Sequence, residues 1–247
     1  MTDGERTRRG GAREADFPRA LRDAIRAGAL SEVPEPALKR FLDAGVRLSL
    51  ARRTVHVAEG EASQPALIVD GLIRANVGSP DGRQVTVSYM RPGDLLGFVG
   101  LFGAALSTTI ETVTDARLLV FAPAEVSRQI ASDVESARLF ARVVARRLTV
   151  VVEELTVHVF GTVRERVCHH LLDLAMGSDP HGPLFAEVTQ QQLADATGAA
   201  RESVARALRD LEAEGLIERT GKRVTLRLPL LMHPAHRHWL EHRLPVS

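Results

Sequence analysis

The sequence of 247 residues contains a single cysteine, Cys168. One cysteine cannot close an internal disulfide, and it cannot supply the four thiolates that an iron–sulfur cluster usually requires. Because Cys168 lies in a run with helical apolar spacing, we expect a small core residue rather than a redox sensor. We also find no haem signature, so the sequence predicts neither a cofactor nor a metal site.

Long apolar runs are missing as well. No stretch approaches the roughly 18 apolar residues that span a bilayer, and the first residues lack the apolar core of a signal peptide. We find no phosphate-binding glycine loop, no paired nucleophile and base, and no metal-hydrolase motif. These absences predict a cytoplasmic protein that has no membrane partner and is not an enzyme.

An excess of charge of one sign is also absent, since 32 basic and 31 acidic residues leave a formal net charge of +1. Lys39 and Lys222 are the only lysines. Without a basic field over the whole protein, a surface that binds nucleic acid has to be a local patch. With 45% hydrophobic residues and this length, the chain can form two globular domains, each with its own core.

Residues 186–228 predict a winged helix-turn-helix. Thr189 and Gln192 form a Thr-x-x-Gln capping box that begins the first helix, and Gly198 ends it at a tight turn. The second helix is expected to begin near Arg201 and to bury a face with apolar residues at i, i+4 and i+7. These are Val204, Leu208 and Leu211. A ribbon follows, with strands Leu216–Arg219 and Arg223–Leu228 around a turn at Thr220–Gly221–Lys222.

The polar side of the second helix carries side chains that suit a DNA major groove. An arginine can donate two hydrogen bonds to guanine O6 and N7, and a glutamate can accept one from cytosine N4. Hydroxyl, amide and ammonium groups suit phosphate contacts, which position a protein without reading sequence. The alternative is a solvated helix face, but the capped helix, the glycine turn and the ribbon together favour DNA. The predicted DNA-binding residues are Thr189, Gln190, Gln191, Arg201, Glu202, Ser203, Arg206, Arg209 and Lys222.

This stretch resembles the DNA-binding domain of the Crp/Fnr superfamily of bacterial transcription regulators. The family's recognition helix carries Arg-Glu-(Ser/Thr)-Val-x-Arg, matched by Arg201–Arg206, and its Leu-x-x-Leu-Glu-x-x-Gly-Leu-Ile is matched by Leu208–Ile217. The resemblance implies that Arg201, Glu202 and Arg206 read a TGTGA-like half-site of double-stranded DNA. Ala200 departs from the family, which often has Ser or Thr there, and the loss of such a cap costs roughly 0.5–2 kcal/mol.

Short β-rich runs separated by turns occupy residues 52–122 and predict an antiparallel roll or barrel. The expected strands are Arg52–Val57, Ala66–Val69, Leu72–Val77, Gln84–Met90, Thr108–Thr114 and Arg117–Phe121. The turn at 79–82 and the later Pro-Gly-Asp-Leu-Leu-Gly motif resemble the cyclic-nucleotide-binding β-roll of the same superfamily. The predicted fold class is α+β: an N-terminal β-roll, a long dimerisation helix and a C-terminal winged helix-turn-helix.

The segments flanking these motifs complete the expected domain plan. Residues 17–50 have a helical pattern that is broken by two prolines and includes Val46 on its apolar side. The predicted segments are a disordered leader (1–16), a β-roll sensor domain (17–132), a dimerisation helix (133–158), a winged helix-turn-helix domain (159–228) and a tail (229–247). We expect a solvated or packed tail; a metal pair of His238 and His242 is the alternative.

The long helix expected over 133–158 begins with a second capping box, formed by Ser132 and Glu135. Its apolar residues follow the alternating spacing of four and three that marks a heptad seam. The seam contains Ala137, Ala141, Val144, Leu148, Val151, Leu155 and His158. The helix could lie on its own β-roll, but superfamily members use it as their dimer axis. The resemblance therefore implies a homodimer, which would place two winged domains on a palindrome.

The resemblance also implies an effector pocket, and here the chain departs from the family's cyclic-AMP binders. Those proteins have a glutamate after the second Gly of Gly-Asp-x-x-Gly, an arginine before a small hydroxyl pair, and hydroxyl residues on the long helix. The matching residues here are Phe98 after Gly97, Leu106 before Ser107 and Thr108, and Val151 with Val152. Because each lost charge-assisted hydrogen bond is worth roughly 1.5–3 kcal/mol, we expect no tight binding of cyclic AMP. The four apolar residues are expected to line a pocket that holds another ligand or is filled by side chains.

Two functional classes fit these patterns. The first is a homodimeric, sequence-specific transcription regulator on palindromic DNA. The second is a nucleotide or small-ligand sensor whose C-terminal domain binds protein, but the intact Arg-Glu-x-x-x-Arg face favours the first. Val159–Gly161 is the expected hinge before the winged domain. In this family a loop at the place of residues 177–185 can contact RNA polymerase.

Overall fold

A computed structural model describes residues 16–28, 30–78, 84–103, 107–132, 134–175 and 184–227 of the chain. The chain divides into two compact units, one built from residues up to Arg74 with Met90–Arg147, the other from Ala75–Tyr89 with Leu148 onward. Residues 1–15 of the predicted leader and the predicted tail, with its two candidate metal-binding histidines, lie outside the described residues.

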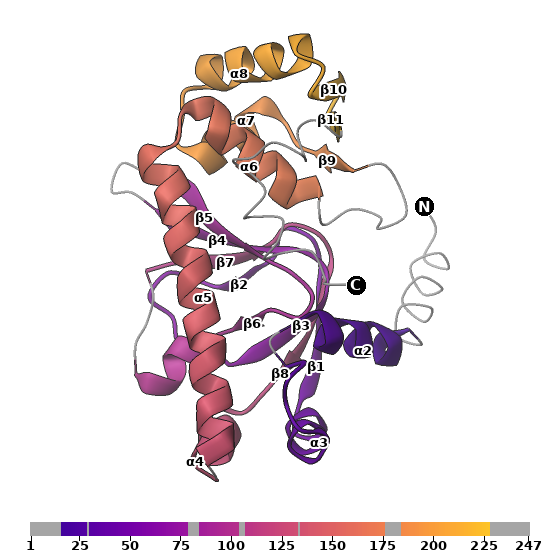
Figure 1. Cartoon of the computed structure of the whole chain (residues 1–247), viewed down its shortest axis with the longest axis vertical. Helices are drawn as coiled ribbons and strands as arrows, with labels where there is room; N and C mark the ends of the chain where they lie inside the picture. The colour runs from indigo at the N-terminus through magenta and orange to yellow at the C-terminus, as the bar shows by residue number, and fades with distance from the viewer. Residues whose placement is uncertain are drawn as a thin grey trace. The chain divides into compact units, whose positions relative to one another are not determined.

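The β-roll consists of two four-stranded sheets, ordered β1-β8-β3-β6 and β2-β7-β4-β5 (Figure 1). Two helices precede it, α2 (Phe17–Ala27) and α3 (Glu35–Asp43). The strands are β1 (Val46–Leu50), β2 (Val55–Val57), β3 (Ala66–Asp70), β4 (Ile73–Gly78), β5 (Gln84–Met90), β6 (Leu95–Leu96), β7 (Thr109–Thr112) and β8 (Ala116–Val120), with the short helix η1 (Phe98–Phe102) after β6. The strand predicted at Gln84–Met90 forms with those bounds, whereas the one predicted at Arg52–Val57 shortens to β2.

The core of the first unit lies between the β3–β8 region and the N-terminal helices. β3 is buried on both faces, and Leu67 and Ile68 are fully inaccessible. Phe17 of α2 and Phe41 of α3 join Leu67 and Phe121 in one cluster, with the rings of Phe41 and Phe121 3.9 Å apart. Apolar packing therefore holds both helices on the roll.

The helical pattern expected through residue 50 is wrong at its end. Val46–Leu50 form β1, which pairs along its whole length with β8, from Val46 opposite Val120 to Leu50 opposite Ala116. Val46, counted on the apolar side of a helix, is instead a largely exposed strand residue. Pairing with a distant strand determines the structure of this segment. The spacing of apolar residues within the segment carries no information about that pairing.

The predicted long helix is α5 (Val134–Phe160), and Ser132, predicted to cap it, is the last residue of another helix. A separate helix that was not predicted, α4 (Pro123–Ser132), precedes it and has proline as its first residue, a favoured position. Ser132 ends α4, and its hydroxyl donates to the carbonyl oxygen of Gln129 at 2.7 Å. The carboxylate of Glu135 accepts a hydrogen bond from Arg138 at 2.9 Å.

The second unit contains the winged helix-turn-helix. Its elements are α6 (Val163–Ala175), β9 (Phe185–Glu187), α7 (Gln190–Thr197), α8 (Arg201–Ala213), β10 (Ile217–Thr220) and β11 (Arg223–Leu226). The three helices pack on one another around a core that includes Leu171, Leu193 and Leu208, and the strand order is β10-β11-β9. Cys168 is a buried member of this core, as predicted, and burial raises the pKa of its thiol to about 11. The predicted α+β fold class is confirmed.

A further capping box joins α5 to α6, next to the predicted hinge. The backbone N–H of Thr162 donates to Glu165 Oε2 at 2.7 Å, and the N–H of Glu165 donates back to Thr162 Oγ1 at 3.2 Å. The Thr-x-x-Glu spacing could have predicted this helix start. Within the part of the chain that is described, no helix is long and apolar enough to cross a bilayer.

Candidate nucleic-acid interface

The first helix of the motif, α7, begins and ends as predicted. The Thr189 hydroxyl accepts a hydrogen bond from the N–H of Gln192 at 3.1 Å, and Gln192 Oε1 accepts one from the N–H of Thr189 at 2.9 Å. Gly198 has φ of 63°, the left-handed conformation that glycine adopts without strain. This turn lets the chain reverse direction and start α8 at Arg201.

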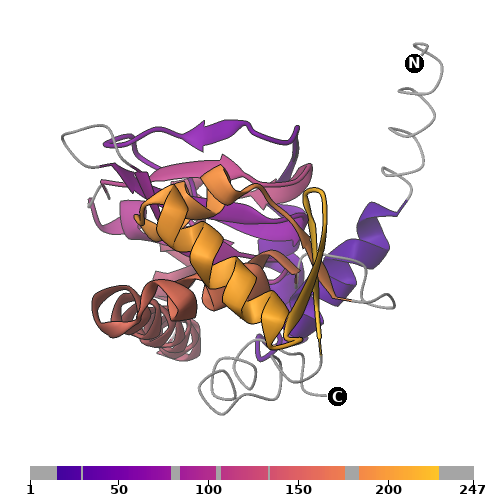
Figure 2. The same cartoon turned by 90° about the horizontal axis from the view of Figure 1, so that it is seen from above.

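The second helix, α8, has one buried and one exposed face. Val204, Leu208 and Leu211 are essentially inaccessible and lie in the core shared with α6 and α7, which confirms the predicted buried face. Ala200 precedes the helix without a side-chain cap. Figure 2 shows α8 lying across the front of its unit, with the β10–β11 ribbon beside it. The predicted contact residues on α8 are all solvent-accessible: Arg201, Glu202, Arg206 and Arg209 are exposed, and Ser203 is half-buried.

The exposed arginines of α8 lack a carboxylate partner, unlike Arg164, Arg219 and Arg227 of this unit. Arg219 in the ribbon is bound to Glu212 at 2.5 Å, and this hydrogen bond lowers the pKa of the Glu212 carboxyl. Among the described residues, no acidic side chain forms an ion pair with Arg201, Arg206 or Arg209. Their guanidinium donors are therefore available to a binding partner.

The ribbon β10–β11 forms the wing. Thr220 pairs with Arg223, which leaves Gly221 and Lys222 as a two-residue turn, with Gly221 at φ of 63°. Lys222 is exposed at the tip, and its carbonyl oxygen accepts a hydrogen bond from the N–H of Val188 at 2.9 Å. This bond fixes the wing tip next to the residues that begin α7. Strand β9, which pairs with β11, was not predicted because three residues show no usable alternation.

The remaining predicted contact residues lie at the start of α7. The Thr189 hydroxyl is engaged in the helix cap, and the Gln191 side-chain amide donates to Asp195 Oδ1 at 2.7 Å. Gln190 is half-buried. Thr189 and Gln191 therefore stabilise the helix-turn-helix itself, in addition to any contact they make with phosphate.

Comparison with known proteins matches both parts of this architecture. Residues 47–133 match the cyclic nucleotide-binding domain family, and residues 165–231 match the Crp-like helix-turn-helix domain family. The transcriptional regulator LdrP of Thermus thermophilus is 32% identical over 179 residues, which cover 71% of this chain and 88% of that protein. The chain belongs to the Crp/Fnr family of transcription regulators.

Further relatives of this Crp/Fnr chain agree with the assignment. The CRP-like cAMP-activated global transcriptional regulator of Mycobacterium tuberculosis is 30% identical over 207 residues, covering 81% of this chain and 92% of that protein. A crystal structure of a CRP-family transcriptional regulator from Thermus thermophilus matches with a TM-score of 0.61 and 31% identity, covering 79% of this chain and 96% of that chain. These relatives are transcription regulators and not enzymes, and the match to a Crp-like helix-turn-helix domain implies DNA binding.

One of the effector-pocket residues predicted for this Crp/Fnr chain lines a pocket of the first unit. Phe98 lines an apolar pocket of the first unit, bounded by α3, α4 and the first turns of α5. Val151 and Val152 are not among its lining residues, and they are 43% and 51% exposed on later turns of α5. Among the predicted effector residues that are described, this pocket therefore contains Phe98 alone.

The other predicted effector residues lie around the loop after β6. A Cβ atom on Gly97 would lie 2.0 Å from the carbonyl oxygen of Gln64, so this close approach requires glycine. Ser107 is exposed and Thr108 is half-buried, whereas Leu106 lies outside the described residues. The RNA-polymerase loop implied at residues 177–185 also falls mostly outside them.

α5 carries a stripe of exposed apolar side chains along the predicted heptad seam. Leu148 and Leu155 are 62% and 59% exposed, and Val144 and Val151 are nearly half exposed. The two alanines of the seam, Ala137 and Ala141, are also exposed. Large apolar side chains gathered on one exposed helix face are typical of a surface that another protein covers.

A cluster of buried histidines was missed in the sequence. The ring of His170 is 2% exposed and lies edge-on to the rings of Tyr89 and His158, each 5.7 Å away. His169 Nε2 lies 3.5 Å from Asp173 Oδ2. Burial lowers the pKa of His170 to about 3, against the opposing charge of Asp173. No group of three metal-ligating side chains occurs among the described residues, so we assign this cluster to the packing of α6.

Proposed function

We propose that the chain is a homodimeric, sequence-specific transcription regulator that places one α8 in each half of a palindromic, TGTGA-like site. The observation that carries this proposal is the pair of unpaired, exposed guanidinium groups of Arg201 and Arg206. Base reading needs donors that are not already used within the protein, on a backbone that does not move. α8 meets both conditions, because its opposite face is locked in the core through Val204 and Leu211.

The contact residues divide into two kinds under this proposal. Arg201, Glu202 and Arg206 read base edges, with the arginines on guanines and the glutamate on a cytosine. The second kind contacts phosphates and sets the position of the helix in the groove. It comprises Thr189, Gln190, Gln191, Ser203, Arg209 and Lys222.

The exposed stripe on α5 supports the homodimer. From Ala137 to Leu155 it follows one helix for about 27 Å. A two-fold axis along this helix would pair the stripe with itself, the self-complementary contact of most symmetric dimers. Two winged domains on one dimer would then read two half-sites, whereas a single small domain buries little DNA surface.

We also infer that cyclic AMP does not control this protein. Phe98 follows Gly97 at the place where the family's cyclic-AMP binders carry the carboxylate for the ribose hydroxyl, and its ring lines an apolar pocket. Calorimetry with cyclic AMP tests this inference; saturable micromolar binding would overturn it. Contact with RNA polymerase through residues 177–185 remains a further part of the proposal.

Arg201→Ala and Lys222→Ala are expected to weaken DNA binding in different ways. The Arg201 variant should lose roughly 1–3 kcal/mol, and the loss should disappear on operators already mutated at the base pair that Arg201 reads. The Lys222 variant should bind all sequences more weakly by a similar factor. The slope of log affinity against log salt concentration should become shallower by about one, because one fewer counterion is released. Fluorescence anisotropy on a set of single-base operator variants at several salt concentrations measures both effects.

Arg138→Ala is the matched control, because it removes an arginine from the exposed surface of α5 and leaves the winged domain intact. It should bind every operator as the unaltered protein does. Identical behaviour of the Arg201 and Lys222 variants across the operator set would contradict the base-reading role of Arg201.

A further inference from the structure

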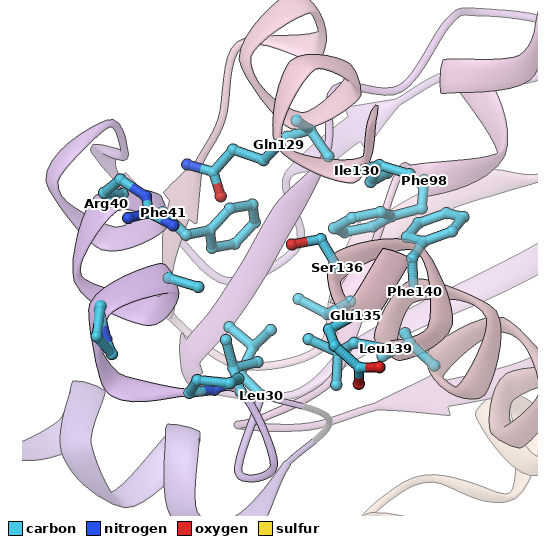
Figure 3. Close-up of a pocket in the computed structure, with 17 residues that line it drawn as sticks. Leu30, Arg40, Phe41, Phe98, Gln129, Ile130, Glu135, Ser136, Leu139 and Phe140 are labelled. Atoms are coloured by element: carbon cyan, nitrogen blue, oxygen red, sulfur yellow. The ribbon is translucent and has the colours of Figure 1, made fainter. Parts of the chain in front are cut away.

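The apolar pocket of the first unit encloses about 270 Å³ between α3, α4, η1 and the start of α5 (Figure 3). Phe41 and Val126 line it and are nearly inaccessible, at 9% and 2% exposure. Phe140 of α5 lines the opposite side, with its ring 5.7 Å from that of Phe98. A cavity with such walls favours an apolar ligand body, because a polar one would lose its hydration without gaining hydrogen bonds.

Polar groups from two helices meet at one rim of this cavity. Figure 3 shows Arg40 of α3 and Gln129 of α4 at the same edge, with the Gln129 amide directed toward Arg40. No carboxylate among the described residues pairs with Arg40. The Gln129 amide nitrogen donates one long hydrogen bond, 3.4 Å, to Glu125, which leaves its second N–H for another acceptor. The rim therefore offers a cation and a neutral donor side by side.

Glu135, the one acidic side chain among the lining residues, does not repel an anion bound at this rim. Glu135 is bound to Arg138 at 2.9 Å, so its charge is compensated within α5. Figure 3 shows its carboxylate on the side of the cavity away from Arg40 and Gln129. The Ser136 hydroxyl, by contrast, points into the cavity.

We propose that this cavity binds a small monocarboxylic acid with an apolar body. The carboxylate of the acid binds to Arg40 and to the Gln129 amide. Arginine suits this group because its planar fork of N–H donors matches the geometry of the two carboxylate oxygens. The apolar body extends toward the paired rings of Phe98 and Phe140. The cavity volume lies near the lower end for small-molecule sites, so the acid is smaller than a typical drug.

The site also adjoins the face of α5 that we assign to the dimer. Val143 lines the cavity, and the next residue, Val144, belongs to the exposed stripe, so the two faces lie about 100° apart on one helix. A bound acid would thus contact the back of the proposed dimer helix. This link to regulation rests on the proposed function, whereas binding of the acid does not.

Isothermal titration calorimetry on the full chain tests the proposal, with decanoate as the acid and decan-1-ol as its uncharged counterpart. Decanoate should bind saturably, one molecule per chain. Decan-1-ol should bind at least about tenfold more weakly, and Arg40→Gln should weaken decanoate to a similar extent, because both changes remove the charge-assisted contact. Leu139→Trp, which fills the cavity, should abolish binding, and a thermal melt checks that this variant folds.

Lys39→Gln is the matched control, since it removes an exposed cation from the neighbouring position of α3 without altering the cavity. It should bind decanoate as the unaltered protein does. The proposal is overturned by an absence of saturable decanoate binding, by equal affinities for the acid and the alcohol, or by equal losses in the Lys39 and Arg40 variants. Because no DNA is present, these results are independent of the operator experiments.

Discussion

Replacing both Leu148 and Leu155 with glutamate is expected to make the protein monomeric and to lower its affinity for a palindromic operator about a thousandfold. The two leucines are the most exposed large apolar members of the seam and would be buried against their symmetry mates in a dimer. Four glutamates brought together in that interface would repel one another and lose hydration, at a cost of several kcal/mol, and about 4 kcal/mol corresponds to the stated factor. Sedimentation equilibrium and anisotropy on one operator measure the two effects.

Arg146→Glu provides the matched control for this prediction. Arg146 is exposed on α5 and lies about 180° around the helix from the seam. A glutamate there should leave the dimer intact and change operator affinity little. A double leucine variant that still sediments as a dimer would show that α5 does not form the interface.

Acid is expected to destabilise the second unit mainly through His170. In the folded state burial holds the pKa of this imidazole at about 3, whereas in the unfolded chain it returns to about 6.5. Below about pH 6.5 the unfolded chain binds a proton that the folded chain does not, so stability falls as the pH falls toward about 3. The full effect is of order 5 kcal/mol, a large share of the stability of a small domain.

His170→Phe isolates this effect while keeping a ring next to Tyr89. Between about pH 6 and about pH 4, the free energy of unfolding of the original protein should fall more steeply than that of the variant, by about 1.4 kcal/mol per pH unit. Urea unfolding followed by hydrogen exchange of the α6 amides gives the slope for this unit. His56→Phe should change the slope less, since burial lowers the pKa of His56 without full enclosure. Parallel pH curves for the original protein and the His170 variant would exclude the proposed proton uptake.

The winged domain could be predicted closely because its signals are local. The cap of Thr189 with Gln192 and the glycine at 198 act within a few residues, and the structure contains both. The buried face of α8 follows from helical periodicity, because apolar residues recur on the core side of the helix at each turn. In these places the residues that specify an element lie inside that element.

The features that were missed depend on residues far apart in the sequence. β1 forms because β8, some seventy residues later, supplies its hydrogen bonds. The cavity lined by Phe98 forms only where α3, α4 and α5 meet, so the pattern of any one segment cannot predict it. His169 and His170 are adjacent polar residues in the sequence, and only the packing of α6 shows that both are buried. Phe98 lines that cavity, whereas Val151 and Val152, later on α5, are not among its lining residues.

Selection of bound sequences from random duplex DNA tests the central claim most directly, because it needs no prior choice of operator. With the full chain, the account predicts enrichment of a palindrome whose two half-sites have centres about one helical turn, or roughly 10 base pairs, apart. The same selection with Arg201→Ala should lose preference at one position in each half and keep the others. A pool without an enriched motif, or one enriched only in a single unpaired half-site, would contradict the claim that two α8 helices read DNA together.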